Sequence, residues 1–399
     1  MSWSSDVGVG APRGAYAVVA KGFFLPGGYV EGGCVTVEGG RFGLYRAEVP
    51  SGMAVLDLGR ARVAPGYVDT HIHGFLGHDV MDADAAGVGE ISRGLARHGV
   101  TSWTPTTLTA PPDQVAAACR SVAEAAADGS TGGAAGGAHI RGVFLEGPFF
   151  TEAHKGAQNP GYLLAPSIGL LEAWQEASGG LVTRVAVAAE AEGAPEFCAA
   201  ARALGVSVFL GHSDASLDEA CACVNAGASG FVHTFNGMRG FSHRDPGMVG
   251  AALGLHGVCA EVICDGRHVD PAAARILVRA RGADGVALVT DCMQAGGMPD
   301  GEYLLGELPV VVSDGAARLA EGSHSLAGSV LTLDRAVRNV RDWGAATDEE
   351  AVRMATQTPA DANGIGGICG RIAPGRDADF VALDDGLHVT ATYISGQEA

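Results

Sequence analysis

An alternation of strand-like and helix-like segments, repeated between residues 64 and 291, constrains the fold of this chain more than any other feature. Each strand-like segment is a short apolar or β-branched run that ends in a polar residue. The carboxyl-terminal parts of the eight runs are residues 68–71, 103–107, 143–146, 185–190, 208–212, 231–234, 261–265 and 286–291. The clearest helical patterns between them cover residues 86–98, 113–127, 194–204, 216–226 and 271–281. Eight such units predict a (β/α)8 TIM barrel of the α/β class, with its chemistry at the carboxyl ends of the strands.

The two ends of the chain follow a different pattern, with short strand-like runs separated by glycine-containing turns. These runs cover residues 15–20, 33–38, 54–63, 378–383 and 390–394. Because neither end is long enough to form a core alone, we expect one small β-sandwich domain from residues 1–63 plus 365–399, with the catalytic barrel at 64–364. After the eighth strand we expect a β-rich excursion at 301–322 and two helices at about 330–343 and 347–358.

Composition and charge exclude several classes of protein. The 399 residues carry 26 basic and 45 acidic side chains, a net charge of −19, so neither nucleic acid nor an anionic membrane is an expected partner. No apolar run reaches the ~18 residues that span a bilayer, and residues 1–20 lack a continuous signal-peptide core. The nine cysteines contain no CxxC pair, which argues against a disulfide scaffold and favours a reducing cytoplasm.

The strongest chemical signal is the pair His71 and His73 at the end of the first predicted barrel strand. Residues i and i+2 of a strand point to the same face, so both imidazoles can enter the mouth of the barrel. Further candidate ligands end other predicted strands, namely Glu146, His212, His233 and Asp291. Such a set at one rim predicts a metal site, and its mixture of imidazole and carboxylate favours Zn²⁺ or Fe²⁺ over Mg²⁺ or Ca²⁺.

A site with two metals would need a bridging anion. The chain has two lysines, Lys21 and Lys155, and neither lies on a predicted barrel strand, so a carboxylated lysine is not available as the bridge. We therefore expect Glu146 to bridge. The remaining ligands then divide into one group of His71, His73 and Asp291 and a second group of His212 and His233. The sequence leaves open whether one or both positions are filled.

Several short motifs stand out along the predicted barrel. They are Pro65–Gly74, Leu145–Pro148, Lys155–Pro160, Gly211–Asp214, His233–Met238, Arg244–Gly247, Asp265–His268, Thr290–Asp291 and Leu326–Ser329. Together they resemble the amidohydrolase superfamily, and within it the N-acetylglucosamine-6-phosphate deacetylases, over residues 60 to 385. The resemblance implies a metal-dependent hydrolase that cleaves the acetamide of N-acetylglucosamine 6-phosphate and releases acetate and glucosamine 6-phosphate.

The resemblance also implies roles for individual residues. Asp291 is implied as the general base that accepts a proton from water and as the acid that delivers it to the leaving amine. The implied substrate contacts are Ala157, Gln158, Asn236, Gly237, Leu326, Ala327 and Gly328, together with the phosphate ligands Arg244 and His268. In the family these phosphate ligands come from a neighbouring subunit, so the resemblance implies an active homodimer. Gln158 departs from the family pattern, because better-known members often carry His there.

Three alternatives remain open. An N-acetylgalactosamine-6-phosphate deacetylase would use the same chemistry, because nothing in the sequence decides the configuration of the 4-hydroxyl. Another amidohydrolase, acting on a cyclic amide or an acetylated amino acid, would not need the phosphate ligands Arg244 and His268. A metal-stabilised binding protein without turnover would use Asp291 only as a ligand.

Overall fold

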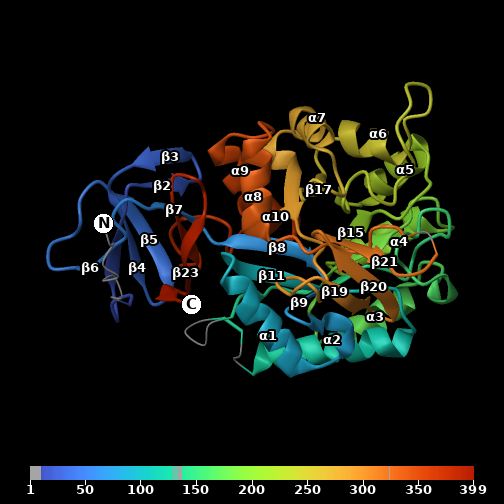
Figure 1. Cartoon of the computed structure of the whole chain (residues 1–399), viewed down its shortest axis with the longest axis horizontal. Helices are drawn as coiled ribbons and strands as arrows, with labels where there is room; N and C mark the ends of the chain where they lie inside the picture. Colours follow the sequence, from blue (N-terminus) through green and yellow to red (C-terminus); the bar gives the residue numbers. More distant parts are fainter. Residues whose placement is uncertain (1–9, 129–130, 133–136, 323) are drawn as a thin grey trace.

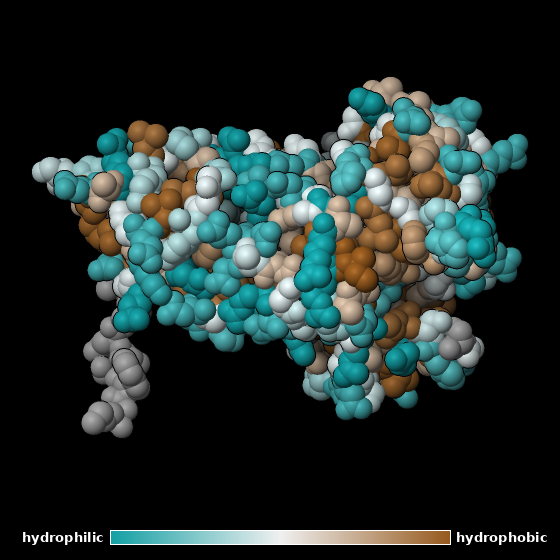
Figure 2. Space-filling model, turned by 90° about the horizontal axis from the view of Figure 1, so that it is seen from above, coloured by the Kyte–Doolittle hydropathy of each residue, from teal (hydrophilic) through white to brown (hydrophobic). Residues whose placement is uncertain are grey.

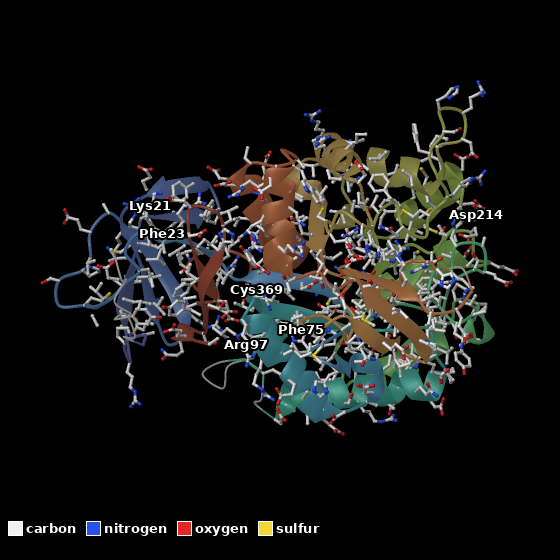
Figure 3. All side chains as sticks on the ribbon, viewed as in Figure 1. Lys21, Phe23, Phe75, Arg97, Asp214 and Cys369 are labelled. Carbon is white, nitrogen blue, oxygen red and sulfur yellow. The ribbon has the colours of Figure 1, made fainter. Side chains whose placement is uncertain are left out.

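The computed structural model of the chain describes residues 10–128, 131–132, 137–322 and 324–399. Figure 1 shows a larger body in which helices surround a set of strands, and a smaller body of strands that come from both ends of the chain. Each body has its own apolar core. Phe75 belongs to the core of the larger body and Phe23 to that of the smaller one (Figure 3).

The larger body is a parallel β-barrel. Its strands are β8 (Tyr67–Ile72), β11 (Val100–Thr107), β13 (Val143–Leu145), β14 (Val182–Val187), β15 (Ser207–Leu210), β16 (Gly230–Phe231), β17 (Cys259–Ile263) and β18 (Val286–Val289). Each strand pairs in parallel with the next. A parallel bridge between Ile72 and Cys292 joins the ends of β8 and β18, and Asp291 N donates to His71 O at 2.8 Å. The predicted TIM barrel is therefore confirmed.

Helices cover the outside of the barrel (Figure 1). They are α1 (Ala85–Ala96), α2 (Pro112–Ala127), α3 (Ile168–Ala177), α4 (Ala194–Ala203), α5 (Leu217–Ala226), α6 (Gly247–Gly254), α7 (Pro271–Arg281), α8 (Leu333–Asp342), α9 (Asp348–Met354) and α10 (Gln357–Ala362). We did not predict α3 or α6 from the sequence. α6 is apolar on nearly every side, so it lacks the alternation of apolar and polar residues that marks a surface helix. A single helix over 347–358 was also wrong, because Thr356 leaves helical geometry, with φ −132° and ψ −81°, and separates α9 from α10.

The two faces of the barrel strands pack into different clusters. Alternate residues point outward and pack against the helices, while a second cluster fills the inside of the barrel. This inner cluster consists of Phe144, Phe150, Ala186, Ala188, Phe209, Val232, Cys259 and Ala287. Two charged side chains on barrel strands, Arg184 on β14 and Glu261 on β17, are also completely buried.

The smaller body consists of two sheets with an apolar core. One sheet has the order β5-β4-β1-β6, with β5 (Arg41–Arg46), β4 (Cys34–Glu38), β1 (Tyr16–Val19) and β6 (Ala54–Asp57). The other has the order β24-β23-β22-β7-β2-β3, with β24 (Gln397–Glu398), β23 (Val389–Ile394), β22 (Phe380–Leu383), β7 (Arg62–Pro65), β2 (Gly22–Leu25) and β3 (Gly28–Glu31). The small sandwich from both chain ends agrees with the predicted fold class, although β2, β3 and β5 were not predicted. β7 crosses the expected boundary at residue 63, and the exact domain limits stay a prediction.

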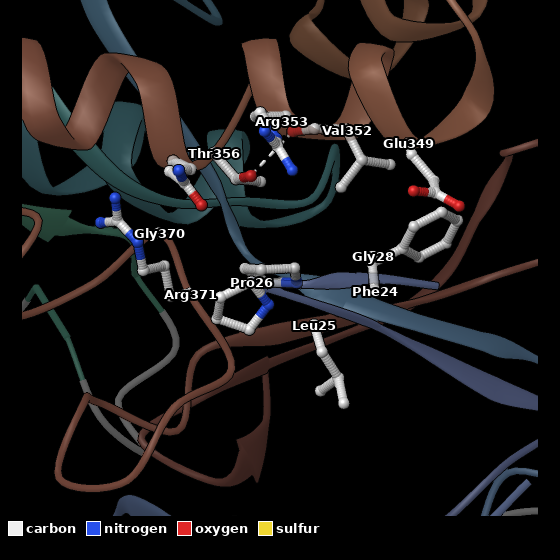
Figure 4. Close-up of a pocket in the computed structure, with 12 residues that line it drawn as sticks. Phe24, Leu25, Pro26, Gly28, Glu349, Val352, Arg353, Thr356, Gly370 and Arg371 are labelled. Carbon is white, nitrogen blue, oxygen red and sulfur yellow. Dashed lines mark hydrogen bonds between the residues drawn. The ribbon is translucent and has the colours of Figure 1, made fainter. Parts of the chain in front are cut away.

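A small cavity lies where the turn between β2 and β3 meets α9 and α10. Figure 4 shows its lining, which includes Phe24, Pro26, Glu349, Thr356 and Arg371. Its volume is about 30 Å³. Ligand pockets usually measure roughly 300–1,000 Å³, so this interdomain cavity is too small to hold a substrate.

The predicted β-rich excursion forms a three-stranded antiparallel sheet, which we call the flap. It comprises β19 (Gly301–Leu305), β20 (Leu308–Ser313) and β21 (Ala316–Leu319). Its inner face, including Leu305, Val310 and Val312, packs in one cluster with Leu108 and Met293 near the carboxyl ends of barrel strands. The flap is thus anchored at the end of the barrel where chemistry is expected, as its position in Figure 1 shows.

The outer surface agrees with the acidic composition. Figure 2 shows a face on which hydrophilic residues predominate and apolar residues form separate patches. Among the residues that the structure describes, no helix combines the length and the apolar character needed to cross a bilayer.

Candidate active site

Side chains from five barrel strands meet at the carboxyl end of the barrel. His71 lies on β8, and the others come within two residues of the ends of β8, β13, β15, β16 and β18; they are His73, Glu146, His212, His233 and Asp291. The backbone is unusual at three of them. His212, His233 and Asp291 have φ values of 47°, 26° and 49°, the left-handed region that non-glycine residues rarely adopt. Such strain is typical of functional sites, where it turns a side chain toward the cavity.

Three ligand atoms form a first compact group. His212 Nε2 lies 3.3 Å from Glu146 Oε1, His233 Nε2 lies 3.0 Å from the same oxygen, and the two imidazole nitrogens are 3.1 Å apart. Donors at roughly 2.0–2.2 Å from a tetrahedral Zn²⁺ lie roughly 3.3–3.5 Å from one another. The spacing of this group therefore fits one divalent cation with a position left for another ligand.

A second group shares the same glutamate. His73 Nε2 lies 3.3 Å from Glu146 Oε2 and 3.1 Å from Asp291 Oδ1. His71 Nε2 lies 3.2 Å from Glu146 Oε1 and 3.6 Å from Asp291 Oδ1. Because both groups include Glu146, this carboxylate is placed to bridge two cations. His71, His233 and Asp291 also lie close enough to form a ligand group, so the division of ligands between two metals stays a prediction.

The imidazoles are anchored in a way that suits metal binding. His71 Nδ1–H donates to Glu261 Oε2 at 3.0 Å, His73 Nδ1–H to Thr106 O at 3.2 Å, and His212 Nδ1–H to His154 O at 3.0 Å. Each anchor leaves the Nε2 lone pair facing Glu146. His71 Nε2 is buried and has no hydrogen-bond partner among the described residues. A buried acceptor of this kind, surrounded by carboxylates, fits a ligand of a divalent cation.

The two carboxylates of the site are ionised at neutral pH. Burial alone would raise the pKa of Glu146, but the imidazoles of His71, His212 and His233 outweigh burial and hold that pKa well below its usual range. Burial likewise acts to raise the pKa of Asp291, and His71 and His73 bring it below its usual range. Both groups can therefore act as anionic ligands, and Asp291 can accept a proton.

A cavity of about 440 Å³ opens above these ligands. Its lining includes most of the predicted substrate contacts, namely Ala157, Gln158, Asn236, Gly237, His268, Leu326 and Gly328. Ala327 does not line the cavity; it is buried with the inner face of the flap. His71 lies beneath the cavity, completely buried.

His268 lies at the cavity of its own chain. We expected His268 to serve the site of a neighbouring subunit, but it lines the cavity of its own chain. His268 Nδ1–H donates to Asp265 Oδ2 at 2.8 Å, which fixes the ring. The loop after β17 turns back over its own barrel, where Asp265 Oδ1 also accepts from the backbone N–H groups of Arg267 and His268. Whether His268 also serves a neighbouring subunit stays a prediction.

Arg244 lies apart from the cavity. It is exposed on the segment before α6, which projects from the barrel in Figure 1. An ion pair of 2.5 Å between Arg239 and Asp245 stabilises this segment, and Arg244 Nη1 lies 3.0 Å from His243 Nε2. The chain's own site therefore does not include Arg244, and its service to a neighbouring subunit stays a prediction.

Gln158 is held beside the bridging glutamate. Its Nε2 donates to Glu146 Oε2 at 3.0 Å, and its Oε1 accepts from Thr109 N at 2.9 Å. The amide thus supports Glu146 while it also lines the cavity.

Sequence reasoning missed three charged residues of the site. Arg318, on β21, lines the mouth of the cavity, and its Nη1 donates to His324 O at 3.2 Å. Glu261 and Arg184 lie beneath the ligands. A charged residue within an otherwise apolar strand is rare, and this signal identifies Glu261 in CAEVI and Arg184 in VTRVAV. Arg318 carries no such signal, because it is exposed, and an exposed arginine in a strand is common.

This barrel, with a buried cluster of imidazoles and carboxylates at the ends of its strands, defines a metal-dependent hydrolase of the amidohydrolase class. The model of the amidohydrolase family matches residues 62–399, and the chain belongs to this family. It is 42% identical to N-acetylglucosamine-6-phosphate deacetylase of Vibrio furnissii over 343 residues, which cover 86% of this chain and 84% of the relative. It is 40% identical to N-acetylgalactosamine-6-phosphate deacetylase of Escherichia coli O157:H7 over 357 residues, which cover 90% of this chain and 93% of the relative.

A solved structure shows the same similarity in three dimensions. It is a mutant of N-acetyl-D-glucosamine-6-phosphate deacetylase from Mycobacterium smegmatis in complex with N-acetyl-D-glucosamine-6-phosphate. The TM-score is 0.90 at 31% identity, with 96% of this chain and 99% of that chain covered.

Proposed function

We propose that this chain hydrolyses the acetamide of N-acetylglucosamine 6-phosphate to glucosamine 6-phosphate and acetate. The observation that carries the proposal is the arrangement of two ligand groups around one shared, buried glutamate, Glu146, below a cavity of about 440 Å³. That volume is suited to a small molecule of sugar size. Relatives with this activity in their names support the choice of substrate.

The proposed cofactor is Zn²⁺ or Fe²⁺, with one or two ions per chain. His212, His233 and Glu146 would hold one ion, and His71, His73, Asp291 and Glu146 the other. A divalent cation bound here polarises the acetamide carbonyl and lowers the pKa of a water molecule toward ~7. Imidazole and carboxylate donors suit these two metals better than Mg²⁺ or Ca²⁺.

Asp291 is the proposed proton carrier. Its carboxylate lines the cavity and is ionised, so it can accept a proton from the water that attacks the carbonyl carbon. The C–N bond then breaks, and Asp291 returns this proton to the nitrogen of the leaving amine. Oxygen from water stays in acetate, and the reaction needs no further reactant.

The sugar phosphate would occupy the outer half of the cavity. Asn236 and Gly237 follow β16, Leu326 and Gly328 follow the flap, and all four residues line the cavity. His268, which the Asp265 carboxylate orients, and Arg318 are candidate cations for the phosphate within the chain's own site. They would supply local positive charge in a chain of net charge −19.

Assembly and location are further parts of the proposal. We propose a homodimer in which Arg244 of one subunit reaches the phosphate bound by the other, since Arg244 is exposed on a projecting segment. The proposed compartment is the cytoplasm. All nine cysteines are free, and eight of them are buried, as suits a reducing environment.

The second candidate substrate is N-acetylgalactosamine 6-phosphate, favoured by the relative from E. coli O157:H7. The test is acetate release from both 6-phosphorylated N-acetylhexosamines and from unphosphorylated N-acetylglucosamine, with metal analysis of the same preparation. We expect a higher kcat/KM with the gluco substrate and little release from the unphosphorylated sugar. A preference for the galacto substrate would support the second candidate. Turnover without dependence on phosphate would favour another amidohydrolase, and metal binding without release of acetate would favour a binding protein.

A further inference from the structure

The metal ligands rest on an ion pair inside the barrel. Arg184 Nη1, from β14, donates to Glu261 Oε1, from β17, and Glu261 Oε2 accepts from His71 Nδ1–H at 3.0 Å. All three side chains are completely buried. A continuous chain of polar contacts therefore runs from the middle of the barrel to one candidate ligand.

Stability alone does not account for this pair. The Arg184 guanidinium lies 3.8 Å from the ring centre of Phe209 and 5.3 Å from that of Phe144. Its Nε and Nη2 have no hydrogen-bond partner within the described ranges of the chain. A buried ion pair is often no more stabilising than apolar side chains of similar volume, and apolar side chains fill the rest of this space.

His71 differs from the other ligands in its anchor. His73 and His212 donate through Nδ1 to backbone carbonyls, of Thr106 and His154. His71 donates to a carboxylate, which fixes the tautomer more strongly and increases the basicity of Nε2. A backbone carbonyl cannot be changed by substitution, whereas the acceptor of His71 can.

We propose that Glu261, held by Arg184, is a positioning residue that fixes His71 in the Nδ1–H tautomer, so that the Nε2 lone pair binds the cation shared with His73, Asp291 and Glu146. This inference rests on the ligand set of the proposed function. It adds that the charge of Glu261, and not its shape, decides how tightly this cation is held. His212, in the other group, is anchored independently of Glu261, through His154 O.

The test compares Glu261→Gln, the double variant Glu261→Gln/Arg184→Met, and a control, Arg281→Met. Arg281, the last residue of α7, is another buried arginine, but it donates to Leu255 O and Val258 O and does not line the cavity. Zn²⁺ affinity is measured by competition with a chelator, the His71 tautomer by ¹⁵N-histidine NMR, and stability by thermal unfolding.

Glu261→Gln is expected to weaken one class of Zn²⁺ site by about 10- to 100-fold and to shift His71 toward the Nε2–H tautomer. The double variant removes both buried charges, so it regains thermal stability relative to Glu261→Gln while its Zn²⁺ affinity stays low. Arg281→Met is expected to lose stability and to keep wild-type Zn²⁺ affinity.

Unchanged Zn²⁺ affinity in Glu261→Gln, or wild-type affinity in the double variant, would overturn the inference and leave the ion pair with a structural role only. These readouts do not depend on turnover. Failure of the wild-type protein to release acetate would therefore count against the proposed function and not against the role of Glu261.

Discussion

The floor and the rim of the cavity are built in different ways. The floor is fixed by the ends of barrel strands, and its residues are between 0% and 8% exposed. It consists of His71, His73, Glu146, His212, His233 and Asp291. The rim is half-buried or exposed and belongs to loops and the flap. It consists of Asn236, Gly237, His268, Arg318, Ser325, Leu326 and Gly328. The rigid floor carries groups for amide hydrolysis in general, whereas the rim carries the groups that can recognise one substrate.

We predict that substitutions in the floor and in the rim change different kinetic constants. Substitutions in the floor should act on kcat and on metal binding, because the floor lies where bonds are made and broken. Substitutions in the rim should act on KM and on the preference for phosphorylated sugars. A floor variant that changes only KM, or a rim variant that lowers only kcat, would contradict these separate roles of the floor and the rim.

The largest expected effect is that of Asp291→Asn. The amide cannot accept the proton from water, so kcat should fall about 10²- to 10⁴-fold with little change in KM. Steady-state acetate release measures the loss, and metal analysis should still find the ion at His212 and His233. The matched control is Asp314→Asn, an exposed flap residue outside the cavity lining, which should keep wild-type kcat. Full kcat in Asp291→Asn would rule out the proposed role.

The next effect is expected at the rim. Arg318→Ala should raise KM for the phosphorylated sugar about 10- to 100-fold, since a charged hydrogen bond contributes about 1.5–3 kcal/mol, while kcat changes less than about 3-fold. The control is Arg267→Ala, which removes an exposed arginine that donates to Asp314 O and does not line the cavity. Equal KM values for Arg318→Ala and the wild type would place the phosphate elsewhere.

A smaller effect is expected at Gln158, between the floor and the rim. Gln158→Leu removes the donor to Glu146 Oε2 and the acceptor for Thr109 N. We expect kcat to fall about 10-fold and the free energy of unfolding to fall by about 1–3 kcal/mol, because Thr109 N is left unpaired. Kinetics and denaturant unfolding of the same preparation measure both. A loss of kcat without any loss of stability would show that the contact with Thr109 matters little.

The smallest effect on activity is expected outside the cavity, at Asp334 on α8. Burial acts to raise the pKa of Asp334, but contacts with His98, Thr332 and Arg338 hold it well below its usual range. The folded-state pKa is thus below that of the unfolded chain, so the carboxylate stabilises the fold above about pH 4 and loses this contribution as the pH falls further. Asp334→Asn should lower the unfolding free energy by about 1–3 kcal/mol at pH 7, with kcat unchanged.

Thermal unfolding across pH 3–7 measures this contribution. The difference between Asp334→Asn and the wild type should shrink toward pH 3. A constant difference over the whole range would contradict the assigned pKa direction.

The floor was predictable from the sequence and the rim only in part, for a physical reason. His71, Glu146 and Asp291 end strand-like runs, and the closed topology of a parallel barrel brings such ends together whatever the intervening loops do. His268 and Arg318 depend on how the loop after β17 and the flap turn, which no periodicity encodes. The hydrogen bond between Glu261 and His71 depends on the register of β17 against β18 and β8, so the sequence marks Glu261 as unusual without showing its partner.

Anomalous X-ray diffraction at the zinc edge, from crystals grown with Zn²⁺, would test most directly whether Glu146 is shared between two cation positions. We expect one peak between Glu146, His212 and His233. We expect a second peak between Glu146, His71, His73 and Asp291, and this one should be weaker in Glu261→Gln crystals. The absence of any peak within coordination distance of Glu146 would contradict this expectation.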